Sequence, residues 1–260
     1  MSNLVLGYNN LIDNATLSGG SWSGALPLSN LKSRYLSKAA RSTNALAAST
    51  LIDIDLGSAK AVQAFGAIRT NIGASGATYR LRGSSVSNFA SSIYDSGTVS
   101  ANAQTPDLII GLPASVTARY WRLEITDTAN AAGYVQIGRL FIGPALAPAD
   151  NYSQGAELGY QSRTGVQQSL GGVDHFDIRT GRRLFAFALD WLTEAEAHNQ
   201  ALELQRICDI HGEVLLIRDP SDTTYNQKRH YLGRLQQLSP IKNPYLTNHQ
   251  AGFEVLEIVA

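Results

Sequence analysis

Short stretches in which apolar and polar residues alternate recur along the first half of the chain. In the clearest, residues 120–126, Trp121, Leu123 and Ile125 alternate with more polar residues, and residues 51–57 repeat the pattern. A period of two predicts strands with one dry and one wet face. Because short strands joined by Ser-, Gly- and Asn-rich turns are typical of sandwiches and jelly rolls, this half is predicted to be all β. Further strands are expected at 4–6, 62–69, 78–83, 93–94, 108–110 and 135–142.

The pattern changes after a stretch rich in Ala and Pro at 145–150. Residues 156–173 are polar and Gly-rich, which predicts an extended arm. Thr193 and Glu196 form a capping box, and apolar residues follow at helical spacing, so an amphipathic helix is expected at about 194–210. Gly212 suits the left-handed position that ends a helix. Strands are expected on either side of this helix, at 177–179, 183–189, 213–217, 230–235 and 252–259.

Together these elements predict a mainly β protein of two domains. Residues 1–144 form an N-terminal jelly-roll β-sandwich, and residues 145–150 form a linker. Residues 151–260 form a small C-terminal α+β domain with one amphipathic helix on a β-sheet. A chain of 260 residues is long enough for each domain to bury its own core.

The amino-acid composition limits which classes of molecule the chain is expected to bind. Charged residues make up only 16% of the chain, and 21 basic residues balance 21 acidic ones, so no net field attracts nucleic acid or an anionic membrane. A weakly charged surface is typical of chains that contact other subunits, and a glycan-facing protein has the same character. The single cysteine, Cys208, excludes an intrachain disulfide and a multi-cysteine zinc site. We find no signal peptide and no apolar run of the about 18 residues that a membrane span needs, so we expect a soluble chain made in the cytoplasm.

The first half resembles the discoidin (coagulation factor 5/8 type C) group of galactose-binding-like jelly rolls. Three strands carry the resemblance: residues 52–57 (IDIDLG), 119–123 (RYWRL) and 138–143 (GRLFIG). These are core motifs of the family, so they imply its fold rather than a ligand. In the last of them Arg139 stands where the family usually has an acidic residue.

The second half is similar to the ring-forming β domain of siphophage distal tail proteins and related baseplate components. The resemblance lies in the strand at 183–189, the capped helix, and the strands at 213–217, 228–235 (KRHYLGRL) and 253–257 (FEVLE). It implies a structural viral protein of the virion tail tip, a homo-oligomer whose copies form a ring of three or six. Other tail and baseplate proteins would then be its neighbours.

No catalytic constellation has the spacing that its chemistry needs, so we expect no enzyme, no cofactor and no metal. The stretch 20–24 (GSWSG) has Trp22 where a nucleophile elbow requires serine. Asp53 and Asp55 share a strand face as paired carboxylates do, although solvated strand positions explain them better. His175 lies between two aspartates, but the other histidines show no ligand spacing.

Loop residues offer a route to carbohydrate binding, because aromatic rings stack on sugar faces and polar side chains hold hydroxyls. Each candidate also has a purely structural alternative: Trp22 plugs the end of the sandwich, and Arg80 pairs with a strand neighbour. The same loops also suit docking to another protein. The candidates are Tyr8, Trp22, Tyr35, Asn71 and Arg80.

Two functional hypotheses remain. The first is a structural subunit of a phage-type tail tip, assembled by protein–protein contacts in which the arm acts as a clasp. The alternative is a carbohydrate-binding adhesin module that recognises host-surface glycans. A hydrolase is disfavoured, because no nucleophile or acid–base pair is found.

Overall fold

The computed structural model describes residues 2–73, 76–101, 106–244 and 247–259, and it confirms the predicted mainly β fold. The chain forms two compact units. The first contains the described residues up to Ala147 together with Leu215–Tyr231, and the second contains Pro148–Val214 and Leu232–Val259. A stretch of the predicted C-terminal domain therefore packs with the first unit, while the predicted domain limits themselves stay a prediction.

The first unit is built mainly from antiparallel strands, with short helical turns between them. Its elements are β1 (Val5–Gly7), η1 (Leu11–Asn14), β2 (Thr16–Ser18), η2 (Leu28–Lys32), β3 (Ala40–Arg41), β4 (Ile52–Ile68), β5 (Thr78–Ser84), β6 (Tyr94–Asp95), β7 (Val99–Ser100), β8 (Leu108–Thr126), β9 (Gln136–Ile137), β10 (Arg139–Gly143), β11 (Ala145–Leu146), β16 (Val214–Ile217) and α3 (Asn226–Arg229).

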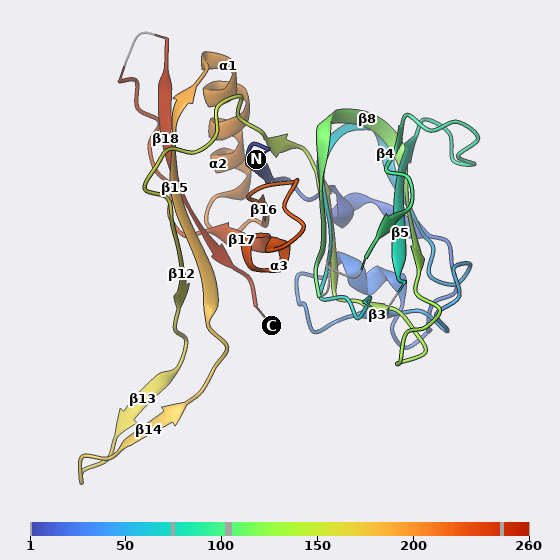
Figure 1. Ribbon diagram of the computed structural model, residues 1–260, viewed down its shortest axis with the longest axis horizontal. Helices are drawn as coiled ribbons and strands as arrows, with labels where there is room; N and C mark the ends of the chain where they lie inside the picture. Colours follow the sequence, from blue (N-terminus) through green and yellow to red (C-terminus); the bar gives the residue numbers. More distant parts are fainter. Residues whose placement is uncertain (1, 74–75, 102–105, 245–246, 260) are drawn as a thin grey trace. The chain divides into compact units, whose positions relative to one another are not determined.

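Two long strands, β4 and β8, run through both sheets of a sandwich. They are 17 and 19 residues long and pair antiparallel over most of their length. The pairing register shifts between Asp55 and Lys60 and again between Val62 and Ala64. Irregular pairing of this kind bends strands, and both strands turn over together at one end of the sandwich (Figure 1). The sequence pattern predicted each half as a separate strand, and in the structure the halves are continuous.

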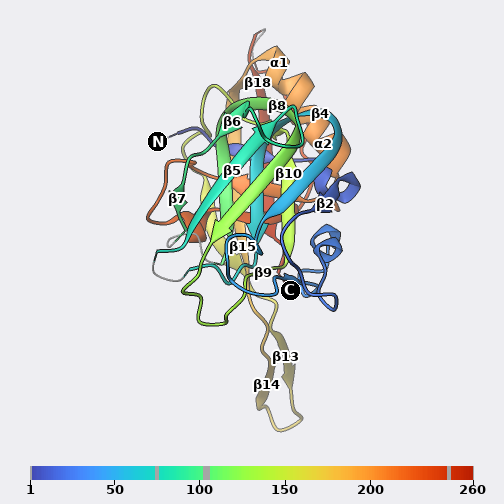
Figure 2. The ribbon, with the colours of Figure 1, turned by 90° about the vertical axis from the view of Figure 1, so that its right-hand side faces the viewer.

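The bend gives each sheet one half of each long strand. The first half of β4 and the second half of β8 pair with β2 and β5, and β5 continues to β6 and β7; this sheet faces the viewer in Figure 2. The second half of β4 pairs with β10 and with the first half of β8. The predicted alternation is confirmed, because Trp121, Leu123 and Ile125 are all buried in the single core between the two sheets.

A further layer covers the outer face of the smaller sheet. β1 pairs antiparallel with β11 on one side and β16 on the other. A side chain at Gly66 would lie 3.2 Å from Leu215, and one at Gly111 would lie 3.1 Å from Pro220. The apolar outer face of this sheet is therefore covered by residues that come more than 140 positions later in the chain than Gly66.

The second unit carries the predicted sheet and helix. Its strands β17, β18, β15 and β12 are neighbours in that order. Phe185, Phe187 and Leu189 are buried on one face of the sheet, as predicted, and Phe187 stacks on Phe253. The elements are β12 (Glu157–Gln161), β13 (Gly165–Gln168), β14 (Asp174–Asp177), β15 (Arg182–Leu192), α1 (Glu194–Glu196), the π-helical turn η3 (Ala197–Ala201), α2 (Leu202–Cys208), β17 (Tyr231–Leu235) and β18 (His249–Glu257).

The capping box is confirmed, but the end of the helix differs from the prediction. The Thr193 hydroxyl accepts from the Glu196 N–H, and the Glu196 carboxylate accepts from the Thr193 N–H at 2.8 Å. The left-handed residue after the helix is Asp209, with φ 45°, and not Gly212. Gly212 is needed for another reason: a Cβ there would lie 2.6 Å from the Cα of Cys208.

The predicted arm, residues 156–173, falls in a longer exposed segment of three antiparallel strands. Residues 157–179, which we call the arm, comprise β12, which pairs with β15, and the hairpin β13–β14, in which Val166 lies opposite Phe176. The hairpin projects beyond the sheet of its own unit (Figures 1 and 2). Both strands of the hairpin are exposed throughout, including Val166 and Phe176. The arm therefore presents apolar side chains that nothing in its own unit covers.

Arg139, at the start of the closing strand β10, is fully buried. Its guanidinium donates to the Leu31 carbonyl oxygen at 3.2 Å and to the Asp13 carboxylate at 2.7 Å. It thus ties the last strand of the sandwich to the two helical turns η1 and η2. A buried guanidinium is tolerated only when it is paired and hydrogen-bonded.

We predict that Asp13→Ala lowers the free energy of unfolding by about 2–3 kcal/mol, because it leaves the buried Arg139 without its counter-charge. Chemical denaturation followed by circular dichroism measures the change. Asp177→Ala is the matched control, because the Asp177–Arg179 pair is exposed on the arm and exposed pairs contribute little. Equal effects of the two variants would contradict this role for the Arg139–Asp13 pair.

Candidate functional site

The shared bend of β4 and β8 places both ends of each strand at the opposite end of the sandwich. Ile52 and Leu123 are paired neighbours in one sheet, and Ala67 and Leu108 are paired neighbours in the other. The connections before, between and after these strand ends therefore gather there. We call this region, formed by the described residues 19–51, 69–73, 76–77, 106–107 and 127–135, the loop end.

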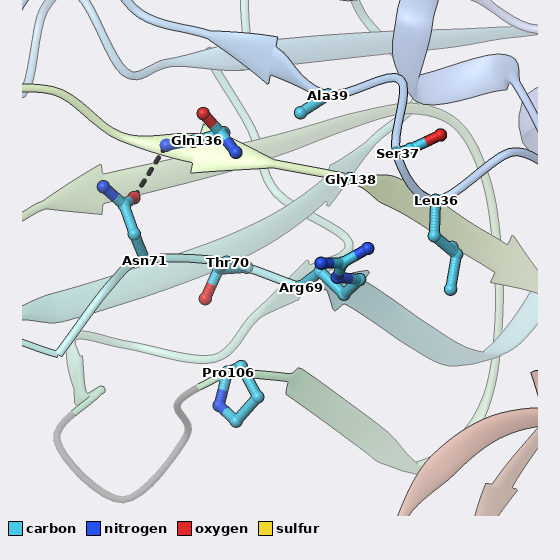
Figure 3. A pocket seen from close by; sticks show the side chains of 9 residues that line it. All are labelled: Leu36, Ser37, Ala39, Arg69, Thr70, Asn71, Pro106, Gln136 and Gly138. Carbon is cyan, nitrogen blue, oxygen red and sulfur yellow. Dashed lines mark hydrogen bonds between the residues drawn. The ribbon is translucent and has the colours of Figure 1, made fainter. Parts of the chain in front are cut away.

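An open pocket of about 440 Å³ lies at the loop end (Figure 3). Its walls come from the turn that precedes β3, the chain that leaves β4, the chain that enters β8, and the turn between β9 and β10. The lining residues are Leu36, Ser37, Ala39, Arg69, Thr70, Asn71, Pro106, Gln136 and Gly138.

Asn71 holds two of these walls together. Its side-chain oxygen accepts from the Gln136 N–H at 2.7 Å, drawn as a dashed line in Figure 3, and its amide donates to the Tyr134 carbonyl at 2.9 Å. Gly138 allows a third wall to approach, because a Cβ there would lie 2.9 Å from the Leu36 carbonyl oxygen. The predicted site residue Asn71 is thus at the pocket, but its side chain positions the backbone.

Arg69 and Thr70 carry side-chain polar groups for which the described part of the chain supplies no partner. Arg69 follows β4 in the left-handed region, with φ 55°, a strained conformation for a residue with a side chain. Its side chain is exposed and lies in the middle of the pocket lining in Figure 3. Thr70 is only 6% exposed, and among the described residues its hydroxyl has no hydrogen-bond partner. A buried hydroxyl without a partner is unfavourable.

Aromatic rings flank the polar lining. Tyr35, a predicted site residue, is 71% exposed in the turn that leads to Leu36. Behind Gln136, the Arg41 guanidinium lies 4.1 Å from the centre of the Tyr134 ring and donates to the Gln136 side-chain oxygen at 3.4 Å. The site therefore combines donors with ring faces, although sequence reasoning singled out only Tyr35 and Asn71 from it.

The other three predicted site residues lie elsewhere or serve the core. Tyr8 is buried at the end of β1, so its ring is not available for stacking on a ligand. Trp22 packs against the sandwich core and donates to the Leu51 carbonyl at 3.3 Å. Arg80 lies on β5, where it pairs with Asp95 and lowers the pKa of that carboxyl to about 2. The purely structural alternatives considered for these two residues were core packing for Trp22 and a strand-neighbour pair for Arg80, and the contacts observed here are of those kinds.

The carboxylates considered for catalysis form ion pairs across strands. Asp53 pairs with Arg122 at 2.5 Å, and Asp55 pairs with Arg119, whose hydrogen bonds hold the pKa of Asp55 below its usual value. His175 lies exposed on the arm. Within the described part of the chain, no cluster of three or more His, Cys, Asp or Glu side chains is arranged to hold a metal ion. Over the same residues, no helix has the length and apolar character to cross a membrane.

The chain matches no protein-family model and no curated protein. Several solved structures that resemble about half of the chain are lectin domains or carbohydrate-binding modules. The lectin domain of lectinolysin in complex with Lewis B antigen is 10% identical, with a TM-score of 0.41, over 52% of this chain and 96% of that one. The family 32 module of C. perfringens NanJ in complex with galactose is 14% identical, with a TM-score of 0.41, over 53% and 98%. A fucose-binding module of Streptococcus pneumoniae is 11% identical, with a TM-score of 0.41, over 52% and 95%.

We predict that Trp22→Ala lowers the free energy of unfolding by about 2–4 kcal/mol, because it removes a large ring from the edge of the core. Denaturation of the full chain measures this effect. Tyr35→Ala serves as the control and should leave stability nearly unchanged, because its ring is mostly in water. An unchanged stability of Trp22→Ala would show that the ring does not plug the sandwich.

Proposed function

We propose that the first unit binds carbohydrate in the pocket at the loop end. The observation that carries the proposal is the pocket itself, about 440 Å³ in volume, with unused polar groups in its lining and an exposed tyrosine beside it. Ligand pockets of this size hold small molecules. A sugar ring needs what this lining supplies, namely polar groups for its hydroxyls and an aromatic face for its C–H groups.

The lining residues suggest distinct roles. Arg69 and the Gln136 amide can donate to ring or hydroxyl oxygens, and the Ser37 hydroxyl can donate or accept. Tyr35 can cover one face of the sugar. The described lining contains amide, hydroxyl and guanidinium groups but no carboxylate, whereas glycoside hydrolysis usually needs a carboxylate pair. This chemistry fits binding without cleavage.

The proposal is tested by screening the purified full chain against a glycan array and titrating the best ligands by calorimetry. Tyr35→Ala is expected to weaken binding about tenfold, because a stacked ring contributes up to about 1.5 kcal/mol. The matched control is Tyr160→Ala, which removes a similarly exposed ring, 74% against 71% for Tyr35, from β12 of the second unit.

Two results would contradict carbohydrate binding here. One is the absence of affinity for every sugar on the array at millimolar concentration. The other is an equal loss of affinity in Tyr35→Ala and Tyr160→Ala, which would place the contact outside the pocket.

A second function, assembly of identical copies, is favoured by the arm. Its exposed apolar side chains include Val166, Leu170, Phe176 and Ile178, and Leu170 is fully exposed. A contiguous apolar surface of this kind is typical of interaction sites. Two-stranded hairpins are marginally stable alone, so contact with a partner would stabilise the arm. The occupant that we propose is the second unit of a neighbouring copy.

Charge supports a second copy as the partner of the arm. At the base of the arm, Arg163 of the arm lies close enough to Arg182 and Arg234 that burial, together with the charges of the other two, lowers the pKa of Arg182. An exposed carboxylate, Asp174, lies on the hairpin. A hairpin that carries a carboxylate can therefore approach the cationic cluster of the next copy. Contact between two different surfaces of one chain is head-to-tail, and such contacts close into rings when the rotation permits.

A ring of three or six copies is what the distal-tail-like resemblance of the second half implies. On this proposal the protein is a tail-tip subunit of a virion, with other tail and baseplate proteins above and below the ring. Both proposed functions are compatible, because they use different units of the chain.

We expect light scattering of the full chain to show an oligomer that dissociates when the arm is made polar. In the double variant Val166→Ser and Phe176→Ser, the mass should fall to that of a 28.0 kDa monomer, because two facing apolar side chains of the hairpin are lost. Ile93→Ser is the control, since Ile93 is exposed in the first unit. A wild-type chain that stays monomeric at every concentration would argue against self-assembly through the arm.

A further inference from the structure

Arginines on the strands and helices of the first unit are generally matched by carboxylates. These pairs hold their guanidinium groups in place and neutralise them. The pairs are Arg80–Asp95, Arg82–Glu124, Arg119–Asp55, Arg122–Asp53, Arg139–Asp13 and Arg229–Asp222.

The two arginines at the pocket do not follow this pattern. Arg69 and Arg41 form no ion pair with any of the residues that the structure describes. Arg41 contacts the neutral Gln136 side chain and the Tyr134 ring. Its Nε atom is buried and has no hydrogen-bond partner in the described structure. Arg41 and Arg69 thus join Arg34 and Lys38, which also form no ion pair within the described structure, at one end of a sandwich in which most strand arginines are neutralised.

Nearby carboxylates are engaged by the backbone and do not line the pocket. Asp107 is buried and accepts from the Arg69 backbone N–H at 2.8 Å, which fixes the backbone and leaves the guanidinium exposed. Asp127 is also buried; one of its oxygens accepts from the Asn130 side-chain amide at 2.7 Å and from the Gly73 backbone N–H at 3.4 Å, and the other has no hydrogen-bond partner among the described residues. The described pocket lining therefore has one cation, Arg69, and no anion. A concave surface with one sign of charge attracts ligands of the opposite sign.

Arg69 is also presented in an unusual way. Its left-handed backbone conformation is costly for a residue with a side chain, and such strain tends to occur at functional sites. Here the strain places a planar set of donors among the pocket residues, where a carboxylate can accept two parallel hydrogen bonds. A neutral hydroxyl can accept from the same donors but gains less from the charge.

From this distribution of charge we infer that the sugar held in the pocket is an acidic one, a uronic acid residue whose carboxylate pairs with Arg69. This inference rests on the proposed carbohydrate-binding function and adds the class of sugar.

The test compares a galacturonic acid oligosaccharide with its methyl ester, which has the same ring but no charge. Calorimetry on the full chain is expected to show that the acid binds at least about tenfold more tightly than the ester, because charge-assisted hydrogen bonds are stronger than neutral ones. Arg69→Gln should weaken the acid far more than the ester and so remove this preference, whereas Arg69→Lys should keep part of it. Arg80→Gln, which removes a paired arginine on β5, should leave the preference intact.

The outcomes separate the inference from the function on which it rests. Equal affinity for acid and ester overturns the acidic-sugar inference while leaving carbohydrate binding in place. A preference that survives Arg69→Gln overturns the role of Arg69. Absence of binding to the acid, the ester and all neutral sugars overturns both proposals. Circular dichroism of each variant establishes that the first unit is folded in every comparison.

Discussion

The shared bend of β4 and β8 is the constraint on which the sandwich depends. The two strands stay paired as they pass from one sheet to the other, so neither sheet can form without them. The bend also fixes where the loops lie. Since both strands turn at one end, their four ends meet at the other, and the pocket is assembled from the chain that leaves or enters these strands. A ligand site at the loop end is thus a geometric consequence of how the core is closed.

Charge is arranged to serve two different purposes in the same unit. On the strands, cross-strand partners such as Arg122 and Asp53 fix neighbouring side chains and cancel each other's field. At the loop end, carboxylates such as Asp107 are used to fix the backbone, and the guanidinium of Arg69 is left for the solvent or a ligand. The total charge of the chain is zero, so composition alone conceals this local imbalance.

The sequence predicted elements whose signal is local, and it missed those that depend on distant contacts. The period of two identified the strand of Trp121, and the capping box identified the start of the helix at Thr193, because each pattern is complete within a few residues. The continuity of β4 was missed, since its exposed middle section around Gly57 has the composition of a turn. Gly212 suggested a left-handed helix end, but close packing on Cys208 explains this glycine and Asp209 takes the left-handed conformation.

The candidate site was predicted only in part, for a similar reason. Exposed polar and aromatic loop residues are visible in a sequence, and Tyr35 and Asn71 were found in this way. Tyr8 looked equivalent, but tertiary packing buries it. Nothing in the local sequence distinguishes Arg69 from Arg80, because the difference lies in which of them has a carboxylate opposite it on a neighbouring strand. Only the register of the sheets supplies that information.

The layer that covers Gly66 and Gly111 makes the first unit discontinuous in the chain. Its first 147 residues are followed by the first part of the second unit, Pro148–Val214, before Leu215 and Pro220 are reached. During translation, the apolar outer face of the smaller sheet therefore stays uncovered while residues 148–214 of the second unit are synthesised. Domains usually fold as units as they emerge from the ribosome, but here the first unit to begin folding is not complete until residue 231 has been made. Cutting the gene within the linker separates the sandwich from its own last layer.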